Sequence, residues 1–249
     1  MSLLSVQREG AGPTFVWLHG FTQTRASAHQ FRSILAGTNE LLTLDLPGHG
    51  AAHEVEATLE ETADLVIQAL PDEPVALGGY SFGGRVALHV AVRHPERINR
   101  LILLGATRGI KDEVERAERR VRDEALAQRI LEIGASAFLD EWLAQPMFAG
   151  LPVDPMERAA RSIHAKGLAS SLRLAGTGTQ VWLQPALATI DSPTLVLAGA
   201  NDSKFSAEAT AIQRGVPGAL VRLIDGAGHA PQLEQPERTA AVVAEFLAG

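Results

Sequence analysis

Gly79-Tyr80-Ser81-Phe82-Gly83 is a G-x-S-x-G stretch that separates a predicted strand from a predicted helix. The apolar run at 74–78 is typical of a short buried strand, and the small and apolar residues at 84–91 are typical of a helix packed on a sheet. The backbone must reverse sharply between these elements, and a glycine on each side of the serine avoids a Cβ clash in the turn. This arrangement predicts that Ser81 is a catalytic serine, held at a strained tip over the positive end of the following helix.

Short apolar runs recur along the chain, with helical patterns between them. Predicted strands cover 14–18, 41–46, 101–104, 194–198 and 220–224, with a candidate edge strand at 3–8, and predicted helices cover 26–35, 58–70 and 236–247. Strands that are apolar throughout belong to parallel sheets that are covered on both faces. We therefore expect residues 1–249 to form a single α/β domain, with a mostly parallel central sheet flanked by helices.

Between about residues 107 and 190 the pattern changes, because no strand is predicted there. Charged helical stretches are predicted at 113–133, 136–144 and 155–174. A helical insertion between two strands of a parallel sheet is most simply a cap, since ligands bind beyond the carboxyl ends of such strands. We expect this helical cap, inserted before the penultimate strand, to close over Ser81 and shape its pocket.

The composition excludes several kinds of partner and site. The net charge of −7 argues against nucleic acid, and no apolar run approaches the ~18 residues that span a bilayer. The N-terminal segment lacks the basic and apolar regions of a signal peptide. The absence of cysteine excludes disulfides and thiolate metal sites, which fits a reducing, cytoplasmic environment. The oligomeric state is left open.

A serine hydroxyl reacts only when a histidine takes its proton and a carboxylate orients that histidine. His229 lies in a Gly-rich turn after the last predicted strand, and Asp202 follows the penultimate strand. With Ser81 they fall in the chain order serine, acid, histidine that is typical of this kind of site. Asp225, close to His229 in sequence, is an alternative acid, whereas Asp191 precedes its strand and so lies at the wrong end.

Negative charge that develops on a substrate needs hydrogen-bond donors. The predicted oxyanion hole consists of the backbone N–H of Phe82, the residue after the serine, and that of Phe21, in the loop after an early strand. His19, in the same loop, is expected to brace the loop rather than to react. The remaining histidines form no cluster at the spacing of metal ligands, so we expect neither a metal nor another cofactor.

From Thr14 to the C-terminus the sequence resembles the α/β-hydrolase superfamily. More narrowly, it resembles the 2-succinyl-6-hydroxy-2,4-cyclohexadiene-1-carboxylate (SHCHC) synthases, the pyruvate-eliminating lyases of menaquinone biosynthesis. The matching stretches are His19-Gly20-Phe21, Asp45-Leu46-Pro47-Gly48-His49-Gly50, Gly79-Tyr80-Ser81-Phe82-Gly83-Gly84-Arg85, Arg116-Ala117-Glu118-Arg119, Trp142-Leu143-Ala144-Gln145-Pro146-Met147-Phe148, Gly167-Leu168-Ala169 and Asp202-Ser203-Lys204-Phe205. The stretch Ala230-Pro231-Gln232-Leu233-Glu234 departs from the family pattern, because it has no second histidine.

The resemblance implies a small anionic organic substrate with several carboxylates, which arginine forks bind with good geometry. It implies contacts from Arg85, on the first turn of the helix after Ser81, and from Arg119 in the cap. Helical periodicity alone does not separate Arg119 from three neighbouring arginines, Arg116, Arg120 and Arg122. The third arginine of the family is assigned to Arg161 in preference to Arg158.

The resemblance also bears on the aromatic residues near the serine. Tyr80, one residue before Ser81, is expected to line the pocket. Trp142 and Phe148 belong either to the pocket wall or to the core of the cap, and the sequence leaves these two alternatives open.

The reaction implied is a lyase reaction, in which the triad leaves Ser81 as a base that removes a substrate proton while pyruvate departs. A serine carboxylesterase or thioesterase is the alternative enzyme, since the same serine can attack a carbonyl. A non-catalytic binding protein is the alternative of another class, and the presence of all three triad candidates argues against it.

Overall fold

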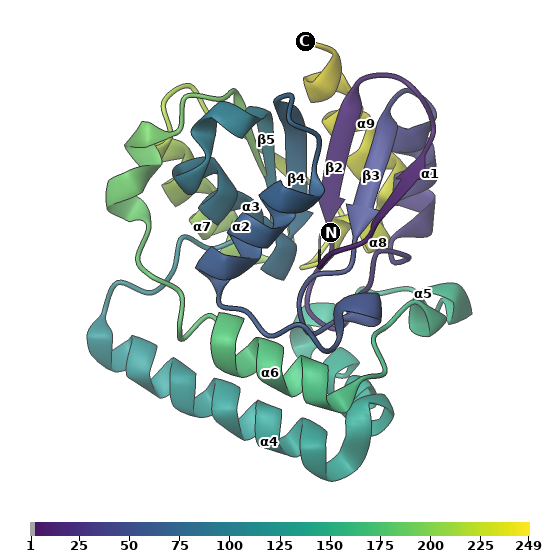
Figure 1. The fold of residues 1–249 in the computed structure, drawn as a ribbon, viewed down its shortest axis with the longest axis vertical. Coiled ribbons are helices and arrows are strands. Elements are labelled where there is room, and N and C mark those ends of the chain that lie inside the picture. Colours follow the sequence, from purple (N-terminus) through teal and green to yellow (C-terminus); the bar gives the residue numbers. More distant parts are fainter. Residues whose placement is uncertain (1–2) are drawn as a thin grey trace.

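A computed structural model describes residues 3–249 and has the predicted α/β-hydrolase architecture (Figure 1). These residues form a seven-stranded sheet in the order β1-β3-β2-β4-β5-β6-β7. The strands are β1 (Val6–Glu9), β2 (Thr14–Leu18), β3 (Glu40–Leu44), β4 (Val75–Tyr80), β5 (Ile98–Leu104), β6 (Thr194–Gly199) and β7 (Leu220–Ile224). Edge strand β1 is antiparallel to β3, and every other pair of neighbours is parallel. The sheet is therefore mostly parallel, as the apolar runs predict.

Helices cover both faces of the sheet. α2 (Leu59–Ala69), α3 (Phe82–Arg93) and α7 (Ser203–Gly215) pack into the apolar core on one face, and α1 (His29–Ala36) and α9 (Pro236–Ala248) into the core on the other. Strand β4, which leads to Ser81, is buried along its whole length. Both faces of β4 are covered, which is why its sequence is apolar without alternation.

The sequence pattern does not predict α7 or the short helix α8 (Pro231–Glu234). In α7 the buried residues are Ala209 and Ile212, so most of this helix carries polar or half-exposed side chains. Its sequence is less apolar on average than that of α3 or α9, so no apolar run marks it as a helix. Its position is nevertheless well defined, because the Asp202 carboxylate accepts the Phe205 N–H at 3.1 Å and so caps the first turn.

The chain between β5 and β6 is helical and lies across the end of the sheet toward which the parallel strands point (Figure 1). Its long helix α4 (Glu113–Leu143) runs beside α6 (Ala165–Ala175), and η3 (Pro146–Phe148), α5 (Pro155–Ala159) and η4 (Gln184–Thr189) complete it. The cap has a small apolar core of its own, to which Ile130, Phe138 and Leu168 belong. α4 is interrupted at Gly134, which has φ 79° and ψ 160°, between the two helices predicted at 113–133 and 136–144.

The prediction of one helix over 155–174 is wrong, because the chain forms α5 and α6 with a break between them. In the break, the Ala160 carbonyl accepts a hydrogen bond from the Thr24 hydroxyl at 2.7 Å, and the Ser162 N–H donates to the Thr22 carbonyl at 2.8 Å. These bonds to the loop after β2 take the place of helical hydrogen bonds. They also hold Arg161 between the cap and the sheet.

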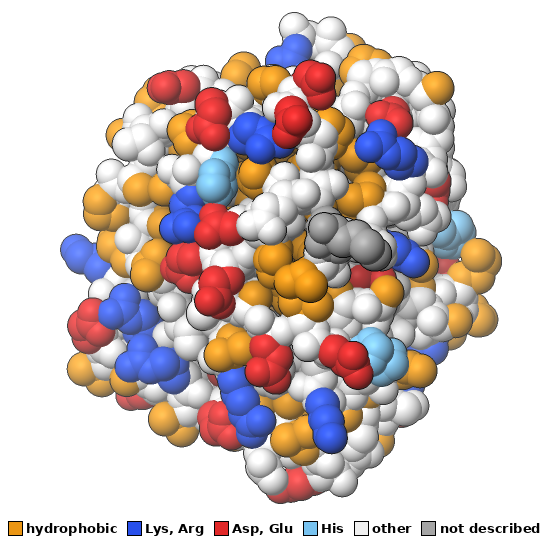
Figure 2. Space-filling model, in the orientation of Figure 1, with side chains coloured by type: hydrophobic (Ala, Val, Ile, Leu, Met, Phe, Trp, Pro, Cys, Tyr) orange, Lys and Arg blue, Asp and Glu red, His pale blue; other side chains and the backbone are white. Residues whose placement is uncertain are grey.

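Acidic and basic side chains are interspersed over the face shown in Figure 2. Several form ion pairs between or within the cap helices, such as Arg173 with Glu124 at 2.7 Å and Arg158 with Asp140 at 2.9 Å. Among the helices of residues 3–249, none is both long enough and apolar enough to cross a bilayer.

The small core of the cap predicts that it opens more easily than the sheet. Local opening costs less where few apolar contacts are broken. We expect backbone amides of α4 and α6 to exchange with deuterium faster than those of β4 and β5, and to slow when a polycarboxylate ligand binds. Hydrogen exchange followed by mass spectrometry measures both effects. Equal protection of cap and sheet, unchanged by ligand, would contradict an independently opening cap.

Candidate active site

Ser81 lies at the turn between β4 and α3 with φ 53° and ψ −104°, a conformation that a residue with a Cβ rarely adopts. Its N–H donates to the Leu104 carbonyl of β5 at 2.8 Å. The flanking glycines make the turn possible, because a Cβ on Gly79 would lie 2.3 Å from the Gly83 carbonyl carbon. The predicted strained tip is therefore present, and the serine precedes the first turn of α3.

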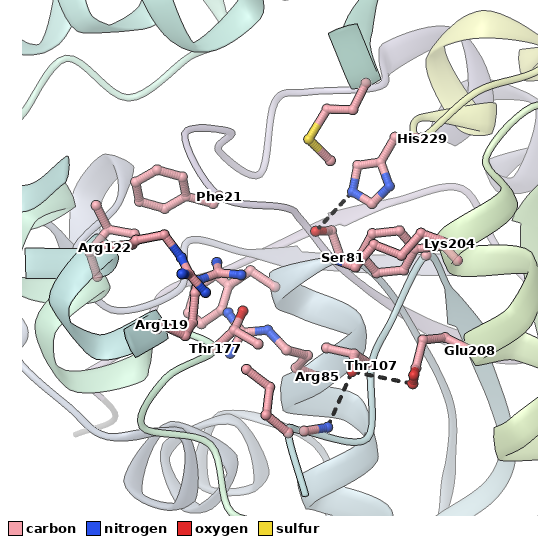
Figure 3. Close-up of a pocket in the computed structure, with 18 of the residues that line it drawn as sticks. Phe21, Ser81, Arg85, Thr107, Arg119, Arg122, Thr177, Lys204, Glu208 and His229 are labelled. Carbon is pink, nitrogen blue, oxygen red and sulfur yellow. Dashed lines mark hydrogen bonds between the residues drawn. The ribbon is translucent and has the colours of Figure 1, made fainter. Parts of the chain in front are cut away.

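The Ser81 side chain meets His229 and Asp202 at the carboxyl ends of the strands (Figure 3). His229 Nε2 lies 3.4 Å from Ser81 Oγ, and His229 Nδ1 lies 2.8 Å from Asp202 Oδ2. The imidazole is 3% exposed. The alternative acid Asp225 has an exposed side chain, and its backbone carbonyl accepts a hydrogen bond from Arg238. The structure thus brings the predicted triad together with Asp202 as its acid.

Asp202 is held in its charged form. Burial by itself raises the pKa of this carboxyl. The hydrogen bonds from His229 and from the Phe205 N–H, together with the charge of Lys204, outweigh the effect of burial. The pKa of Asp202 therefore lies below its ordinary value. An ionised Asp202 accepts the Nδ1–H of His229 and leaves Nε2 free to take a proton from Ser81.

The start of α3, which carries the Phe82 N–H, approaches closely the end of β2, which leads to the loop with Phe21. A Cβ on Gly83 would lie 2.3 Å from the Leu18 carbonyl oxygen and 2.6 Å from that of His19, so only glycine allows this contact. Within residues 3–249, neither N–H donates to another group of the chain. Both residues line the same cavity as Ser81, and two free donors, one of them at the start of a helix, suit an oxyanion hole.

Two buried histidines hold the loop that carries Phe21. His19 Nε2 accepts the Leu46 N–H at 3.0 Å, while its Nδ1 lies 2.9 Å from the Gly20 carbonyl. His49 Nε2 accepts the Thr22 N–H at 3.3 Å, and burial lowers the pKa of His49 to about 3. Both rings are therefore neutral braces between loops, which confirms the expectation for His19.

A cavity of about 1050 Å³ opens above Ser81, between the sheet and the cap. Arg85, Arg119, Arg122 and Arg161 all line it, as do Tyr80, Trp142 and Phe148. In Figure 3 the side chains of Arg85, Arg119 and Arg122 approach one another on one side of Ser81, and Lys204 and Glu208 lie on the other. Guanidinium groups are thus concentrated on one wall of the cavity.

Arg85 is 8% exposed, and its Nη1 donates to the Ala175 carbonyl of α6 at 2.9 Å. Its guanidinium carbon lies 5.4 Å from the centre of the Phe82 ring. Burial, with repulsion from Arg119, lowers the pKa of Arg85 to about 9, so the group is still a cation at neutral pH. A buried cation with one anchored N–H leaves its other donors for a ligand.

Arg119 is anchored in a similar way, because its Nε donates to Asp123 at 2.8 Å. The other three arginines that the sequence offered for this role either have other partners or are exposed. Arg116 pairs with Glu113, Arg120 donates to the Gly178 carbonyl, and Arg122 is 61% exposed at the cavity mouth. The geometry therefore favours Arg119 among the arginines of this helix.

Arg161 lies in the break between α5 and α6 and is 8% exposed, and its Nη1 donates to the Thr22 hydroxyl at 3.1 Å. Burial lowers the pKa of Arg161, with Tyr80 and Glu157 opposing this effect. Arg158 points away, toward Asp140 and the Ser136 carbonyl. The choice of Arg161 over Arg158 is consistent with this geometry.

The aromatic residues belong to both the wall and the core. Trp142 packs edge-on against Phe21 with ring centres 5.2 Å apart, and Phe148 lies 5.9 Å from the His229 ring. Tyr80 lies 5.4 Å from His229, and burial raises the pKa of Tyr80 far above its ordinary value, so its phenol stays neutral. The two sequence alternatives for Trp142 and Phe148 are therefore not exclusive.

Three residues around the site are not assigned roles from the sequence: Lys204 and Phe205, which line the cavity, and Glu234 behind His229. Lys204 and Phe205 lie in the quoted Asp-Ser-Lys-Phe segment, and the Phe205 ring is 4.3 Å from that of His229. Glu234 accepts the N–H groups of Gly228 and Ala230 at 2.7 and 2.9 Å and so fixes the backbone on both sides of His229. The family segment points to Lys204 and Phe205, whereas no local pattern points to Glu234.

Metal ligands are not gathered anywhere in the described part of the chain. Residues 3–249 contain no group of three or more His, Cys, Asp or Glu side chains that could hold an ion.

The family model described as "Alpha/beta hydrolase family" matches residues 15–242. An SHCHC synthase of Serratia proteamaculans is 32% identical over 97% of this chain and 95% of its own length. A Bacillus subtilis protein that is provisionally given the same name is 33% identical over 95% of this chain and 91% of its own length. The chain belongs to the α/β-hydrolase family, in its SHCHC synthase group.

Solved structures agree with this membership. The structure described as MenH from S. aureus superimposes with a TM-score of 0.90 at 31% identity, covering 100% of this chain and 98% of that one. A thermophilic esterase from Thermogutta terrifontis, described as malate bound, superimposes with a TM-score of 0.82 at 24% identity, covering 98% of this chain and 93% of that one. The second likeness shows the α/β-hydrolase fold alone.

The lowered pKa of Asp202 predicts how the triad contributes to stability. Because the folded pKa is below the unfolded value of about 3.9, the contribution is present above roughly pH 4 and is lost as pH falls through the folded pKa. We expect Asp202→Asn to lower the free energy of unfolding at pH 7, and to lower it less at pH 3. Urea denaturation at several pH values measures the difference. A difference that is the same at pH 3 and pH 7 would contradict the charged pairing.

Proposed function

We propose that the protein is an SHCHC synthase, a carbon–oxygen lyase that eliminates pyruvate from a carboxylate-rich menaquinone intermediate. The observation that carries the proposal is the set of anchored arginines over the triad. Arg85, Arg119 and Arg161 each donate one hydrogen bond to the protein, and all three residues line the cavity. The family membership and the likeness to MenH support the same reaction.

In the proposed mechanism Ser81 is the base. His229 Nε2 takes the serine proton, Asp202 stabilises the imidazolium that results, and the Ser81 oxyanion removes a proton from the substrate carbon. The electron pair of that C–H bond forms a new C=C bond, and the C–O bond to the departing three-carbon group breaks. The His229 imidazolium gives its proton to the leaving enolate, which is released as pyruvate, and the triad returns to its starting state. No bond between Ser81 and the substrate forms.

The N–H groups of Phe21 and Phe82 stabilise the enolate-like charge in this proposal. Support comes from Phe21, which lines the same cavity as Ser81, and from the N–H of Phe82, which is at the positive end of α3. Donors that are fixed before the reaction need no reorganisation as the charge develops.

The substrate carboxylates pair with Arg85, Arg119 and Arg161. Hydrogen bonds to charged groups contribute roughly 1.5–3 kcal/mol each, so several such contacts dominate binding of a polyanion. Tyr80, Trp142 and Phe148 surround the carbon skeleton.

The same proposal covers the organisation and setting of the protein. Residues 1–249 form one domain with a cap at about 107–190. The protein works in the cytoplasm, has no nucleic acid or membrane partner and needs no cofactor.

A serine carboxylesterase or thioesterase with a neutral substrate does not need these cations. Desolvating a guanidinium is costly unless a charged partner arrives, and Arg85 is almost fully buried. The arginines therefore favour the lyase over the alternative enzyme, although the triad suits both.

Removal of the base tests the site. Ser81→Ala should lower the rate of pyruvate release from the menaquinone intermediate by several orders of magnitude, because triad members act as a unit. The melting temperature should change little. Pyruvate is followed with lactate dehydrogenase and NADH. Retention of more than about a tenth of the wild-type rate would show that Ser81 is not the base.

Arg85→Ala separates the two enzyme alternatives. We expect kcat/KM for pyruvate release to fall about ten- to a hundredfold, at ~1.4 kcal/mol per factor of ten. Hydrolysis of p-nitrophenyl acetate, slow in the wild type, should be nearly unaffected, because this ester has no carboxylate. The opposite pattern, with rapid ester hydrolysis and no pyruvate release by the wild type, would favour the esterase.

A further inference from the structure

Asp123 is a buried acidic residue on the cap helix α4 that the proposed mechanism does not use. Its side chain is 3% exposed, although its neighbour Glu124 on the same helix is 56% exposed. A carboxylate is costly to bury unless its charge is paired and its oxygens accept hydrogen bonds. Both oxygens of Asp123 are in fact used, which indicates a specific role.

One oxygen of Asp123 holds Arg119. Oδ1 accepts the Arg119 Nε–H at 2.8 Å, from one turn earlier on α4. A guanidinium has five N–H donors, and this bond occupies the one on Nε. Within residues 3–249 the Nη groups of Arg119 make no hydrogen bond, and the residue lines the cavity (Figure 3). The fork of two nitrogens is thus left for a ligand.

The other oxygen of Asp123 holds the loop that follows α6. Oδ2 accepts the Gly178 N–H at 3.0 Å. A Cβ on Gly176 would lie 2.6 Å from Oδ2, and a Cβ on Gly178 would lie 2.5 Å from the Arg120 nitrogen, so these glycines allow the loop to approach the carboxylate. Thr177, between them, lines the same cavity and lies near Arg119 in Figure 3.

Asp123 also sets the local charge. Arg85 and Arg119 repel each other, and Asp123 opposes this repulsion at Arg85. Arg85, Arg119 and Asp123, two cations and one carboxylate, together carry a net charge of about +1. The wall therefore still attracts a carboxylate group, while neither guanidinium is left without a counter-charge.

We infer that Asp123 is a positioning residue for substrate binding: held in place by the Gly178 N–H, it aims the Nη fork of Arg119 at one carboxylate of the substrate. The inference rests on the proposed function in that Arg119 contacts the substrate. Asp123 itself touches no reacting atom. Its effect passes through Arg119, and this separates it from a residue that merely stabilises the cap.

A double-mutant cycle tests the coupling. Asp123→Asn should raise KM for pyruvate release about tenfold or more with kcat within about threefold, because a contact made equally in ground and transition states affects KM. In an Arg119→Ala background the same change should have almost no further effect. Glu124→Gln, a matched carboxylate-to-amide change in a cap ion pair outside the cavity, is the control and should leave KM unchanged. Additive effects, or an equal rise in KM in the control, would overturn the inference.

Arg119→Lys gives a second test that keeps Asp123 intact. A lysine at this position pairs with Asp123 through its single ammonium group and has no fork left for the substrate. We expect KM to rise as much as in Arg119→Ala. If lysine restores the wild-type KM, charge alone suffices and the positioning role is wrong. This result stands even if Asp123→Asn does not fold.

Succinate binding separates this inference from the lyase proposal. Wild-type protein should bind succinate in an NMR titration, and Asp123→Asn should bind it at least about fivefold more weakly. Absence of pyruvate release by the wild type would end the lyase proposal and leave the succinate result standing. Equal succinate affinity in both proteins, or no binding by either, would overturn the role of Asp123.

Discussion

The strained turn at Ser81 is the constraint on which the rest of the site depends. A positive φ at a residue with a side chain persists only where the surroundings fix it. Here β4 is buried in the centre of the sheet, and Gly79 and Gly83 allow α3 to pack against strand ends at distances that no Cβ would permit. The same turn places the N–H of Phe82 directly after the serine, at the start of α3. In the proposed function, one backbone reversal therefore positions the base and one donor of the oxyanion hole together.

Around this turn, each of three cavity arginines is anchored to the protein by one hydrogen bond. Arg85 is held by a carbonyl of α6, Arg161 by the hydroxyl of Thr22, and Arg119 by Asp123. Each anchor bridges two segments that are distant in sequence or joins successive turns of a cap helix. In the proposed function, a cation held in this way loses little further side-chain entropy when a carboxylate arrives, so its remaining donors can contribute to binding. Arg85 comes from α3, which packs on the sheet, whereas Arg119 and Arg161 come from the cap.

Much of this arrangement is predictable from the sequence, because the strands are apolar throughout and the triad lies at strand ends in a fixed order. Ser81, Asp202 and His229 meet as expected. Local sequence patterns do not predict the structure where tertiary contacts determine it. The break between α5 and α6 depends on hydrogen bonds to the Thr22 loop, and the sequence of α7 is too polar on average to stand out as a buried helix. The roles of Asp123 and Glu234 are not predictable from the sequence for the same reason, because they depend on the N–H groups that donate hydrogen bonds to these carboxylates.

The central claim is that Ser81 acts as a base and never as a nucleophile. The most direct measurement is the intact mass of the wild-type protein, quenched at successive times during a single turnover of the menaquinone intermediate, with pyruvate measured in the same samples. The account predicts that pyruvate appears in an amount equal to the substrate consumed while the protein mass stays unchanged at every time. A transient increase in mass that maps to Ser81 would contradict it.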